Sequence, residues 1–192
     1  MPLYEPQEDS ELLASFVGKL AAGRVLDMGT GSGIQAFAAA ARPAVSSVLA
    51  VDIDDDALAH VKTELRKAEN GALTRKITVI KSDLFTNIDP DERFDTIVCN
   101  PPYLPAEETD DHPALYGGAN GYELIAEFLS QTRTHLASSG TILLLFSSLS
   151  NKEVLLGEAK RIGYLAEELA VEYHFFEQLY VYRLRRRNDE WG

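Results

Sequence analysis

The sequence predicts an α/β fold, a mostly parallel sheet with helices on both faces, on three observations. Helical and strand patterns alternate along the chain. The strand patterns are short apolar runs, as expected of parallel strands buried on both faces. A glycine-rich segment, residues 29–33, joins the first strand pattern to a helical one. Because ligands of such folds bind at the carboxyl ends of the strands, we expect the functional site there.

The predicted helices follow from hydrophobic periodicity and from residues that begin or end helices. Apolar residues recur at helical spacing within residues 8–20, which predicts a first helix. The next helix leads from the glycine segment to residue 41 and stops before Pro43. Asp54 is expected to cap a third helix, residues 55–69, which Asn70 and Gly71 end. Two further helices are predicted at residues 122–136 and 152–162.

Strands are predicted at residues 24–28, 47–53, 77–81, 95–99 and 141–147. Two last strands, residues 165–173 and 178–185, lie close enough in the sequence to form an antiparallel hairpin. The segment from residue 101 to residue 121 is rich in proline, glycine and acidic residues, and such a long loop is usually functional or disordered. No repeat or linker interrupts the pattern, so a single domain over residues 1–192 is expected.

The composition restricts the class of protein and of partner. With 45% hydrophobic and 25% charged residues, the chain is expected to be globular. A net charge of −12 disfavours a partner that offers only phosphate. No apolar run approaches the roughly 20 residues of a membrane helix, the first residues carry no basic signal-peptide region, and the lone Cys99 fits a reducing cytoplasm. Four arginines are interpreted as a solvated strand end and tail: Arg183, Arg185, Arg186 and Arg187.

A glycine-rich loop is the first part of a candidate cofactor site. Gly29, Gly31 and Gly33, with Thr30 between the first two, let the backbone approach a ligand closely at the start of a helix. Alone, such a loop is compatible with NAD, FAD or S-adenosylmethionine.

Acidic residues at the ends of the next two predicted strands extend this site. Asp52 lies about 20 residues beyond the glycines, where a carboxylate can accept hydrogen bonds from both ribose hydroxyls, and Ile53 follows it. Asp83 follows the third strand, where its carboxylate can accept a hydrogen bond from an adenine amino group. Leu84, the next residue, can supply a backbone N–H to the adenine.

Asp27 distinguishes between the candidate cofactors. A carboxylate before the glycine loop would repel the pyrophosphate of a dinucleotide. S-adenosylmethionine has no phosphate and carries a sulfonium and an α-ammonium cation. We therefore expect S-adenosylmethionine, with Asp27 at its methionine end.

The candidate catalytic segment is Asn100, Pro101, Pro102 and Tyr103, directly after the fourth predicted strand. An amide or aromatic amine nitrogen is a poor nucleophile because its lone pair is delocalised. The Asn100 side-chain oxygen and the Pro101 carbonyl can accept hydrogen bonds from its two N–H groups. Tyr103 can stack on the planar group, and the prolines stiffen the loop. Methyl transfer then requires mainly alignment, so the segment predicts methylation of a planar nitrogen.

Cys99 and the four histidines are not assigned to chemistry. Cys99 has no base partner in the sequence pattern and is expected to lie in the core. The histidines lack the spacing of a metal-ligand set, so no metal site is predicted: His60, His112, His135 and His174.

Together these motifs resemble the HemK/PrmC family of protein glutamine methyltransferases, in its short archaeal and eukaryotic branch. The resemblance covers YEPQEDS at residues 4–10, DMGTGSG at 27–33, VDI at 51–53, SDLF at 82–85, NPPY at 100–103 and YGGANG at 116–121. It implies a Rossmann-like methyltransferase fold, with a seven-stranded sheet whose last strand is antiparallel, and no additional N-terminal helical domain. Ser10 stands where threonine is usual, which keeps a hydroxyl.

The resemblance also implies a donor, an acceptor and a partner. The donor is S-adenosylmethionine, contacted by Ser10, Asp27, Gly29, Asp52, Asp83, Leu84 and Asn100. The acceptor is the glutamine amide in the Gly-Gly-Gln loop of a class 1 translation release factor, held by residues 100–103. Short-branch members resemble one another in needing a small zinc-binding activator subunit, which is expected at the sheet-edge strand of residues 77–81.

A second hypothesis keeps the chemistry but makes the acceptor an exocyclic amine of adenine or guanine in RNA or DNA, because Asn-Pro-Pro-Tyr occurs in such enzymes too. Base methylation usually needs base flipping and a basic track for the nucleic acid. The acidic composition disfavours this reading, although a partner could supply the track. A non-catalytic cofactor-binding module is disfavoured by the intact Asn100 and Tyr103. The sequence also leaves open a small-molecule or lysine methyltransferase. Among these acceptors, glutamine is preferred.

Overall fold

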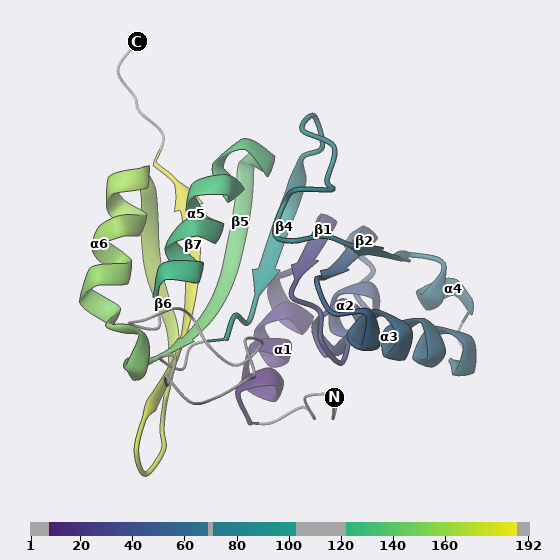
Figure 1. Ribbon diagram of the computed structural model, residues 1–192, viewed down its shortest axis with the longest axis horizontal. Helices are drawn as coiled ribbons and strands as arrows, with labels where there is room; N and C mark the ends of the chain where they lie inside the picture. The colour runs from purple at the N-terminus through teal and green to yellow at the C-terminus, as the bar shows by residue number, and fades with distance from the viewer. Residues whose placement is uncertain (1–7, 69–70, 103–121, 188–192) are drawn as a thin grey trace.

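The strands of the computed structural model, which describes residues 8–68, 71–102 and 122–187, form one seven-stranded sheet (Figure 1). Their order across the sheet is β3-β2-β1-β4-β5-β7-β6. β7 is antiparallel to both of its neighbours, and the other strand pairs are parallel. This confirms the Rossmann-like class predicted from the sequence. The bounds are β1 (Gly23–Met28), β2 (Val45–Asp52), β3 (Ile77–Lys81), β4 (Phe94–Cys99), β5 (Leu136–Ser147), β6 (Tyr164–Tyr173) and β7 (Gln178–Arg186).

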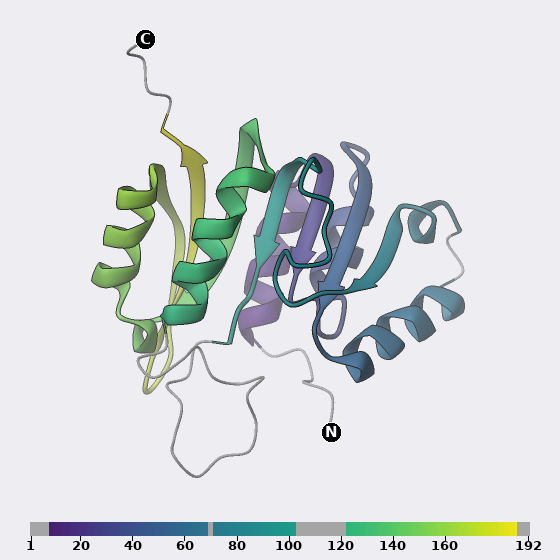
Figure 2. The same cartoon turned by 45° about the horizontal axis from the view of Figure 1, so that its top comes forward.

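Helices cover both faces of the sheet (Figures 1 and 2). α1 and α2 pack on one face and on each other, α5 and α6 pack on the opposite face, and α3 lies beside β2 and β3. The helices are α1 (Glu8–Leu20), α2 (Ile34–Ala40), α3 (Asp55–Lys67), α4 (Gly71–Thr74), α5 (Glu123–His135) and α6 (Lys152–Ile162), with a 3-10 turn, η2 (Ser148–Ser150). In the described part of the chain, none of these helices has the length and apolarity needed to cross a membrane.

Two hydrophobic clusters, one on each face, hold the layers together. β5 contributes to both, because successive side chains of a strand point to opposite faces. Leu144 and Phe146 join the cluster under α5 and α6, whereas Leu143 and Leu145 join the one under α1 and α2. All four side chains are completely buried. The uninterrupted apolar run of this strand therefore reflects its burial on both sides.

Most element boundaries lie within two residues of the sequence-based expectation, and two of the differences have a clear physical reason. α3 ends at Lys67, where Ala68 turns to an extended conformation, and Gly71 begins α4 rather than ending α3. The last fully buried side chain of α3 is Val61, so a longer helix would gain little further burial. β5 begins at Leu136, five residues before the predicted start, because Leu136 is buried and pairs with Phe94. The residues after Leu136 carry no strand pattern, which is why the sequence does not predict the early start.

Candidate functional site

The predicted site residues come together at the carboxyl ends of β1, β2 and β4, the lower edge of the sheet in Figure 1. The register places Met28 beside Val51 on one side and beside Cys99 on the other. The residues at or directly after the ends of these three strands, which include the glycine loop, Asp52 and Asn100, are therefore neighbours. This edge is where ligands bind in open α/β sheets.

The glycine loop presents an open face to this edge. Gly29 has a φ of 70°, and apart from Gly29 and its two chain neighbours, no heavy atom of the described residues lies within 4 Å of where a Cβ would stand. Gly33 serves another purpose, since a Cβ there would lie 3.0 Å from Val61 and 3.2 Å from Phe37. Thr30 fixes the loop on the sheet by donating its N–H to the carbonyl of Val51, at 2.8 Å. The space beside Gly29 is thus left for a ligand, while Gly33 permits close helix packing.

Asp27 lies beneath the loop with one carboxylate oxygen unpaired. Its side chain is only 1% exposed, and its Oδ2 accepts a hydrogen bond from the Thr30 hydroxyl at 2.6 Å. Its Oδ1 is buried and has no hydrogen-bond partner within the described chain. Burial raises the pKa of Asp27 from 3.8 to about 7, with a further rise from the negative Asp52 and a partial offset by Thr30. A buried, unpaired acceptor of this kind favours a cationic or hydrogen-bond-donating ligand group.

The raised pKa of Asp27 predicts a specific pH dependence of stability. Between pH 3.8 and about 7 the folded state holds a proton that the unfolded chain has lost, so this carboxyl destabilises the protein progressively as the pH rises. Each unit by which the pKa in the folded state exceeds that in the unfolded state lowers the free energy of unfolding by about 1.4 kcal/mol once the pH is above both pKa values. Asp27→Asn should therefore make the ligand-free protein more stable than wild type at pH 8. Urea unfolding of both proteins at pH 8 and pH 4.5 measures this, and an equal stability difference at the two pH values contradicts it.

Asp52, at the end of β2, and the turn after β3 extend the candidate site from the glycine loop toward the β3 edge of the sheet. The Asp52 carboxylate accepts the N–H of Gly31 at 2.9 Å and that of Asp54 at 3.0 Å, which fixes its orientation. Ile53 follows with 58% of its surface exposed, an apolar side chain at the rim. Asp83 is exposed, and Leu84 has a φ of 44°, which is uncommon for a residue other than glycine. Unfavourable backbone geometry of this type is concentrated at functional sites.

Asn100 is held in one orientation by the first turn of α1. Its side-chain Nδ2 donates to Asp9 Oδ2 at 3.0 Å and to Ser10 Oγ at 3.3 Å. Because an ionised carboxylate only accepts hydrogen bonds, Asp9 determines which end of the amide faces it. The Asn100 Oδ1 then points away and is buried without a hydrogen-bond partner in the described residues. The site therefore presents a fixed, unpaired acceptor beside the glycine loop.

Asp9 and Gln35 are the residues of this arrangement that sequence reasoning did not assign. Asp9 and Ser10 are both only 4% exposed, and Gln35 Nε2 donates to the Ser10 carbonyl at 2.9 Å, which ties α1 to α2. Asp9 lies within the YEPQEDS motif, directly before the predicted cofactor contact Ser10, and this position is the sequence feature that could have identified it. The predicted Tyr103 and residues 4–7 of that motif lie outside the described residues.

Cys99 is buried among apolar side chains, as expected, and burial raises the pKa of its thiol. It is therefore a structural residue rather than a nucleophile. Within the described residues, no three His, Cys, Asp or Glu side chains are grouped as a metal site would require.

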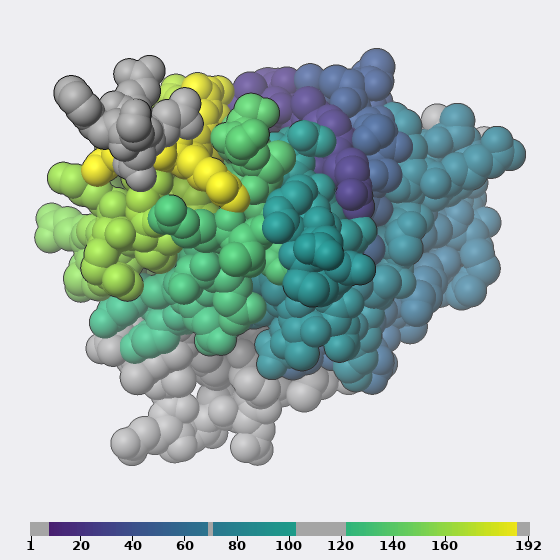
Figure 3. All heavy atoms as spheres, turned by 90° about the horizontal axis from the view of Figure 1, so that it is seen from above, coloured from purple at the N-terminus to yellow at the C-terminus, as the bar shows by residue number. Residues whose placement is uncertain are grey.

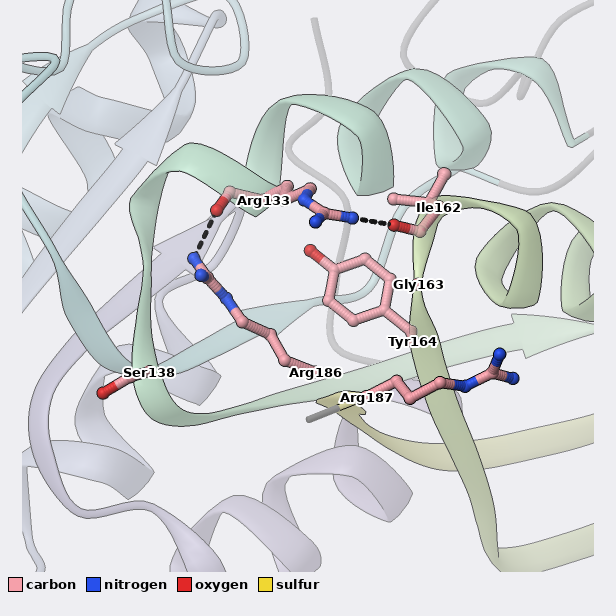
Figure 4. Close-up of a pocket in the computed structure, with 7 residues that line it drawn as sticks. All are labelled: Arg133, Ser138, Ile162, Gly163, Tyr164, Arg186 and Arg187. Carbon is pink, nitrogen blue, oxygen red and sulfur yellow. Dashed lines mark hydrogen bonds between the residues drawn. The ribbon is translucent and has the colours of Figure 1, made fainter. Parts of the chain in front are cut away.

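Arg186 and Arg187 line a cavity at the other end of the sheet, enlarged in Figure 4. That end of the molecule faces the viewer in Figure 3. Arg133 donates to the carbonyl of Ile162, and Arg186 donates to the carbonyls of Arg133 and Leu136. Arg183 forms an ion pair with Glu167. The interpretation as a solvated strand end is wrong for Arg186, because this side chain satisfies the final carbonyls of α5. The cavity lies away from the glycine loop and belongs to the structural framework.

Comparison with known proteins agrees with this geometry. Residues 5–168 match the family described as the methyltransferase small domain. A putative protein N5-glutamine methyltransferase of Methanocaldococcus jannaschii is 32% identical over 185 residues, which cover 93% of this chain and 89% of that protein. A release factor glutamine methyltransferase of Rhodopirellula baltica is 38% identical over 130 residues. That match covers 62% of this chain and 43% of the relative, so the chain spans less than half the length of that relative.

A solved structure with a similar fold is that of the Mtq2–Trm112 complex of E. cuniculi, described as responsible for the methylation of the eRF1 translation termination factor. It aligns with a TM-score of 0.73 and 26% identity over 97% of this chain and 99% of that one. A ribosomal protein L11 methylase of Lactobacillus delbrueckii, at 22% identity and a TM-score of 0.66, shares the fold. The fold and the sequence therefore lead to the same group of proteins.

Proposed function

We propose that this chain, which belongs to the methyltransferase small domain family and to its protein N5-glutamine methyltransferases, methylates the glutamine of the Gly-Gly-Gln loop in a class 1 translation release factor. The observation that carries the proposal is the Asn100 Oδ1, a buried acceptor that is oriented by Asp9 and has no partner in the described chain. A glutamine amide offers the N–H group that this oxygen requires. A cytoplasmic location is part of the proposal, because translation termination takes place there.

S-adenosylmethionine is the proposed methyl donor, and the residues present fit it. The unpaired Asp27 Oδ1 matches the α-ammonium group, and the open side of Gly29, with Thr30, Gly31 and Gly33, leaves room for the methionine part. Asp52, whose carboxylate is fixed by two backbone N–H groups, is proposed to accept the ribose hydroxyls. The exposed Ile53 is proposed to cover the adenine, and Asp83 with Leu84 to recognise its edge. Ser10 is proposed to support the site through Asn100. The donor, when bound, supplies an electrophilic methyl group on a sulfonium.

The side chains of this protein activate the nitrogen by orientation. Asn100 Oδ1 would accept one N–H of the glutamine amide and the Pro101 carbonyl the other, which directs the nitrogen lone pair toward the methyl group. Pro102 and Tyr103 are proposed to complete the holder for the glutamine. Formation of the bond between nitrogen and methyl would be matched by cleavage of the bond between methyl and sulfur, whose electron pair stays on the neutral thioether that leaves. The alkylated nitrogen would lose one N–H proton to solvent, because that proton is strongly acidic once the nitrogen is alkylated. Alignment and polarisation are thus the catalytic contributions of the chain.

The release factor is favoured by the functions for which two relatives are named, the R. baltica protein and the E. cuniculi complex. A second candidate substrate is ribosomal protein uL3, because a uL3 glutamine methyltransferase of Burkholderia pseudomallei is 34% identical over 136 residues. Both candidates are glutamine side chains of proteins, so the chemistry at Asn100 is the same. The acidic charge of −12 continues to disfavour a nucleic-acid base.

A small zinc-binding activator subunit is the proposed partner. Support comes from the second chain of the E. cuniculi complex and from β3, which ends the sheet and leaves one side without a strand partner in the described chain. An open strand edge can pair with a strand of another protein. The proposed heterodimer would therefore place the activator on the side of the sheet opposite to β6.

The decisive experiment incubates the protein with methyl-labelled S-adenosylmethionine and one of three acceptors: a class 1 release factor, uL3, or total tRNA with duplex DNA. Each reaction is run with and without a co-expressed activator subunit. We expect label on the release factor and none on the same factor with its Gly-Gly-Gln glutamine replaced by alanine. Label on uL3 or nucleic acid, without label on the release factor, overturns the proposal.

A further inference from the structure

The hairpin between β6 and β7 carries three exposed aromatic side chains, which we call the aromatic tip. Tyr173 is 78% exposed, Phe175 92% and Phe176 89%. The two phenylalanine rings meet edge to face, with centroids 4.6 Å apart. Single exposed apolar residues are ordinary, but a contiguous apolar group marks an interaction site. Aromatic side chains are also enriched at the centres of protein interfaces.

The aromatic tip stands on a hairpin with a fixed base. His174 donates its backbone N–H to the Glu177 carbonyl at 2.8 Å, which closes the turn. The Glu177 carboxylate accepts the hydroxyl of Ser147 at 2.5 Å, and the Gln178 N–H donates to Ser148 Oγ at 3.0 Å. Ser147 ends β5 and Ser148 directly follows it. The hairpin is therefore tied to the sheet edge that carries the candidate site. An anchored surface loses less conformational freedom when a partner binds.

The β6–β7 hairpin, which carries the aromatic tip, projects beyond the carboxyl edge of the sheet, on the same side as the start of α1 (Figure 1). His174 Nδ1 lies 3.0 Å from Glu8 Oε2, and the next residue, Asp9, holds Asn100. β7 is separated from β4 by β5 alone, which corresponds to about 10 Å between those strands. A peptide that rises about 3.3 Å per residue needs only a few residues to extend from the Asn100 site to the hairpin.

The charges around the aromatic tip indicate the chemistry of its partner. Glu8 and Glu172 both lie next to His174, at 3.0 and 3.6 Å, and both are exposed. Acidic side chains around an exposed apolar surface favour a partner that presents positively charged and apolar side chains. A second copy of this chain, with a net charge of −12, is a poor match. The activator subunit is expected at β3, the opposite edge of the sheet from β6.

We propose that the aromatic tip docks the substrate protein beside its methylated glutamine, by contacting an apolar and positively charged segment that flanks the Gly-Gly-Gln loop. This inference rests on the proposed function and deepens it, since it assigns the recognition of the protein to the hairpin and the chemistry to Asn100. Recognition outside the reacting group allows a large substrate to be selected without changing the methyl-transfer site.

The test is steady-state kinetics of the double variant F175S/F176S with intact release factor and, separately, with a short Gly-Gly-Gln peptide. We expect KM for the release factor to rise at least tenfold, with kcat, cofactor affinity and kinetics on the short peptide nearly unchanged. Leu165→Ser is the matched control, because it removes an apolar residue with 54% exposure from the far end of β6. The thermal midpoints of both variants should stay close to wild type because the altered side chains are exposed.

Three outcomes overturn the inference, and they are distinguishable. Equal KM for the release factor in wild type and F175S/F176S removes the docking role and leaves the proposed function intact. No transfer to the release factor by the wild-type protein overturns the proposed function and the docking role together. A dimer that becomes a monomer in F175S/F176S, seen by light scattering with unchanged kinetics, assigns the surface to a second copy instead.

Discussion

Asn100→Ala is expected to lower the rate of methyl transfer by about 100- to 1,000-fold, to a residual rate that can still be measured. The Kd for S-adenosylmethionine should stay within about tenfold, or about 1.4 kcal/mol. The alanine removes the buried Oδ1, the acceptor that orients the glutamine nitrogen. Loss of one preorganised hydrogen-bonding group in an active site typically lowers kcat by about 100- to 1,000-fold. Single-turnover transfer of labelled methyl gives the rate, and calorimetric titration of the ligand-free protein gives the Kd.

The matched control for this variant is Gln131→Ala, which also removes a carboxamide but from a partly exposed position late in α5, where its Nε2 donates to Glu127. Its kcat should equal that of wild type. Undiminished turnover of Asn100→Ala would exclude the proposed role of the Oδ1. If Asn100→Ala lost turnover and also lost more than about a hundredfold in affinity for the cofactor, Asn100 would be assigned mainly to cofactor binding.

Asp9→Ala is expected to lower kcat by about 10- to 100-fold, the range for one hydrogen bond to a charged group. Without the carboxylate, the Asn100 amide keeps only the longer bond to Ser10 and can reverse, presenting Nδ2 where Oδ1 should be. The effect should appear in kcat rather than in KM, because the glutamine is misoriented rather than excluded. Glu11→Ala is the control, since it removes an exposed carboxylate from the same turn of α1.

A double-mutant cycle separates this positioning role from a structural one. If Asp9 acts through Asn100, adding Asp9→Ala to Asn100→Ala should cause no further loss of turnover, whereas independent effects would multiply. Asp9→Asn should fall between wild type and Asp9→Ala, because it keeps one acceptor oxygen. If the losses of turnover in the two single variants multiply in the double variant, Asp9 does not act through Asn100.

The fold could be predicted from the sequence because its information is local. The buried strands are apolar runs, Asp54 caps α3 by accepting the Asp56 N–H at 2.9 Å, and the hairpin of β6 and β7 follows from proximity. The early start of β5 at Leu136 could not be predicted, because that pairing is decided by a contact with Phe94. The chain there has no alternation or β-branched residues to signal a strand.

The candidate site was predictable in its members and less so in their hydrogen bonds. The glycine loop, Asp27, Asp52 and Asn100 are attached to strand ends, and strand order alone brings these positions together. The role of Asp9 depends on how α1 packs across the sheet, which places it beside a residue 91 positions away. The buried state of Asp27 likewise follows from tertiary packing, so its raised pKa cannot be read from residue type.

The contact between α1 and Asn100 has a consequence for how the protein acquires activity. α1 is synthesised before β4 and β5, yet its buried residues Leu13 and Val17 pack in the cluster to which β5 contributes Leu143 and Leu145. Contacts this distant in sequence form late, because the loop-closure entropy must be offset first. A nascent chain can therefore complete its glycine loop long before Asn100 is oriented. Catalytic activity would then be among the last properties to appear during folding. Its appearance would indicate that the complete sheet has assembled.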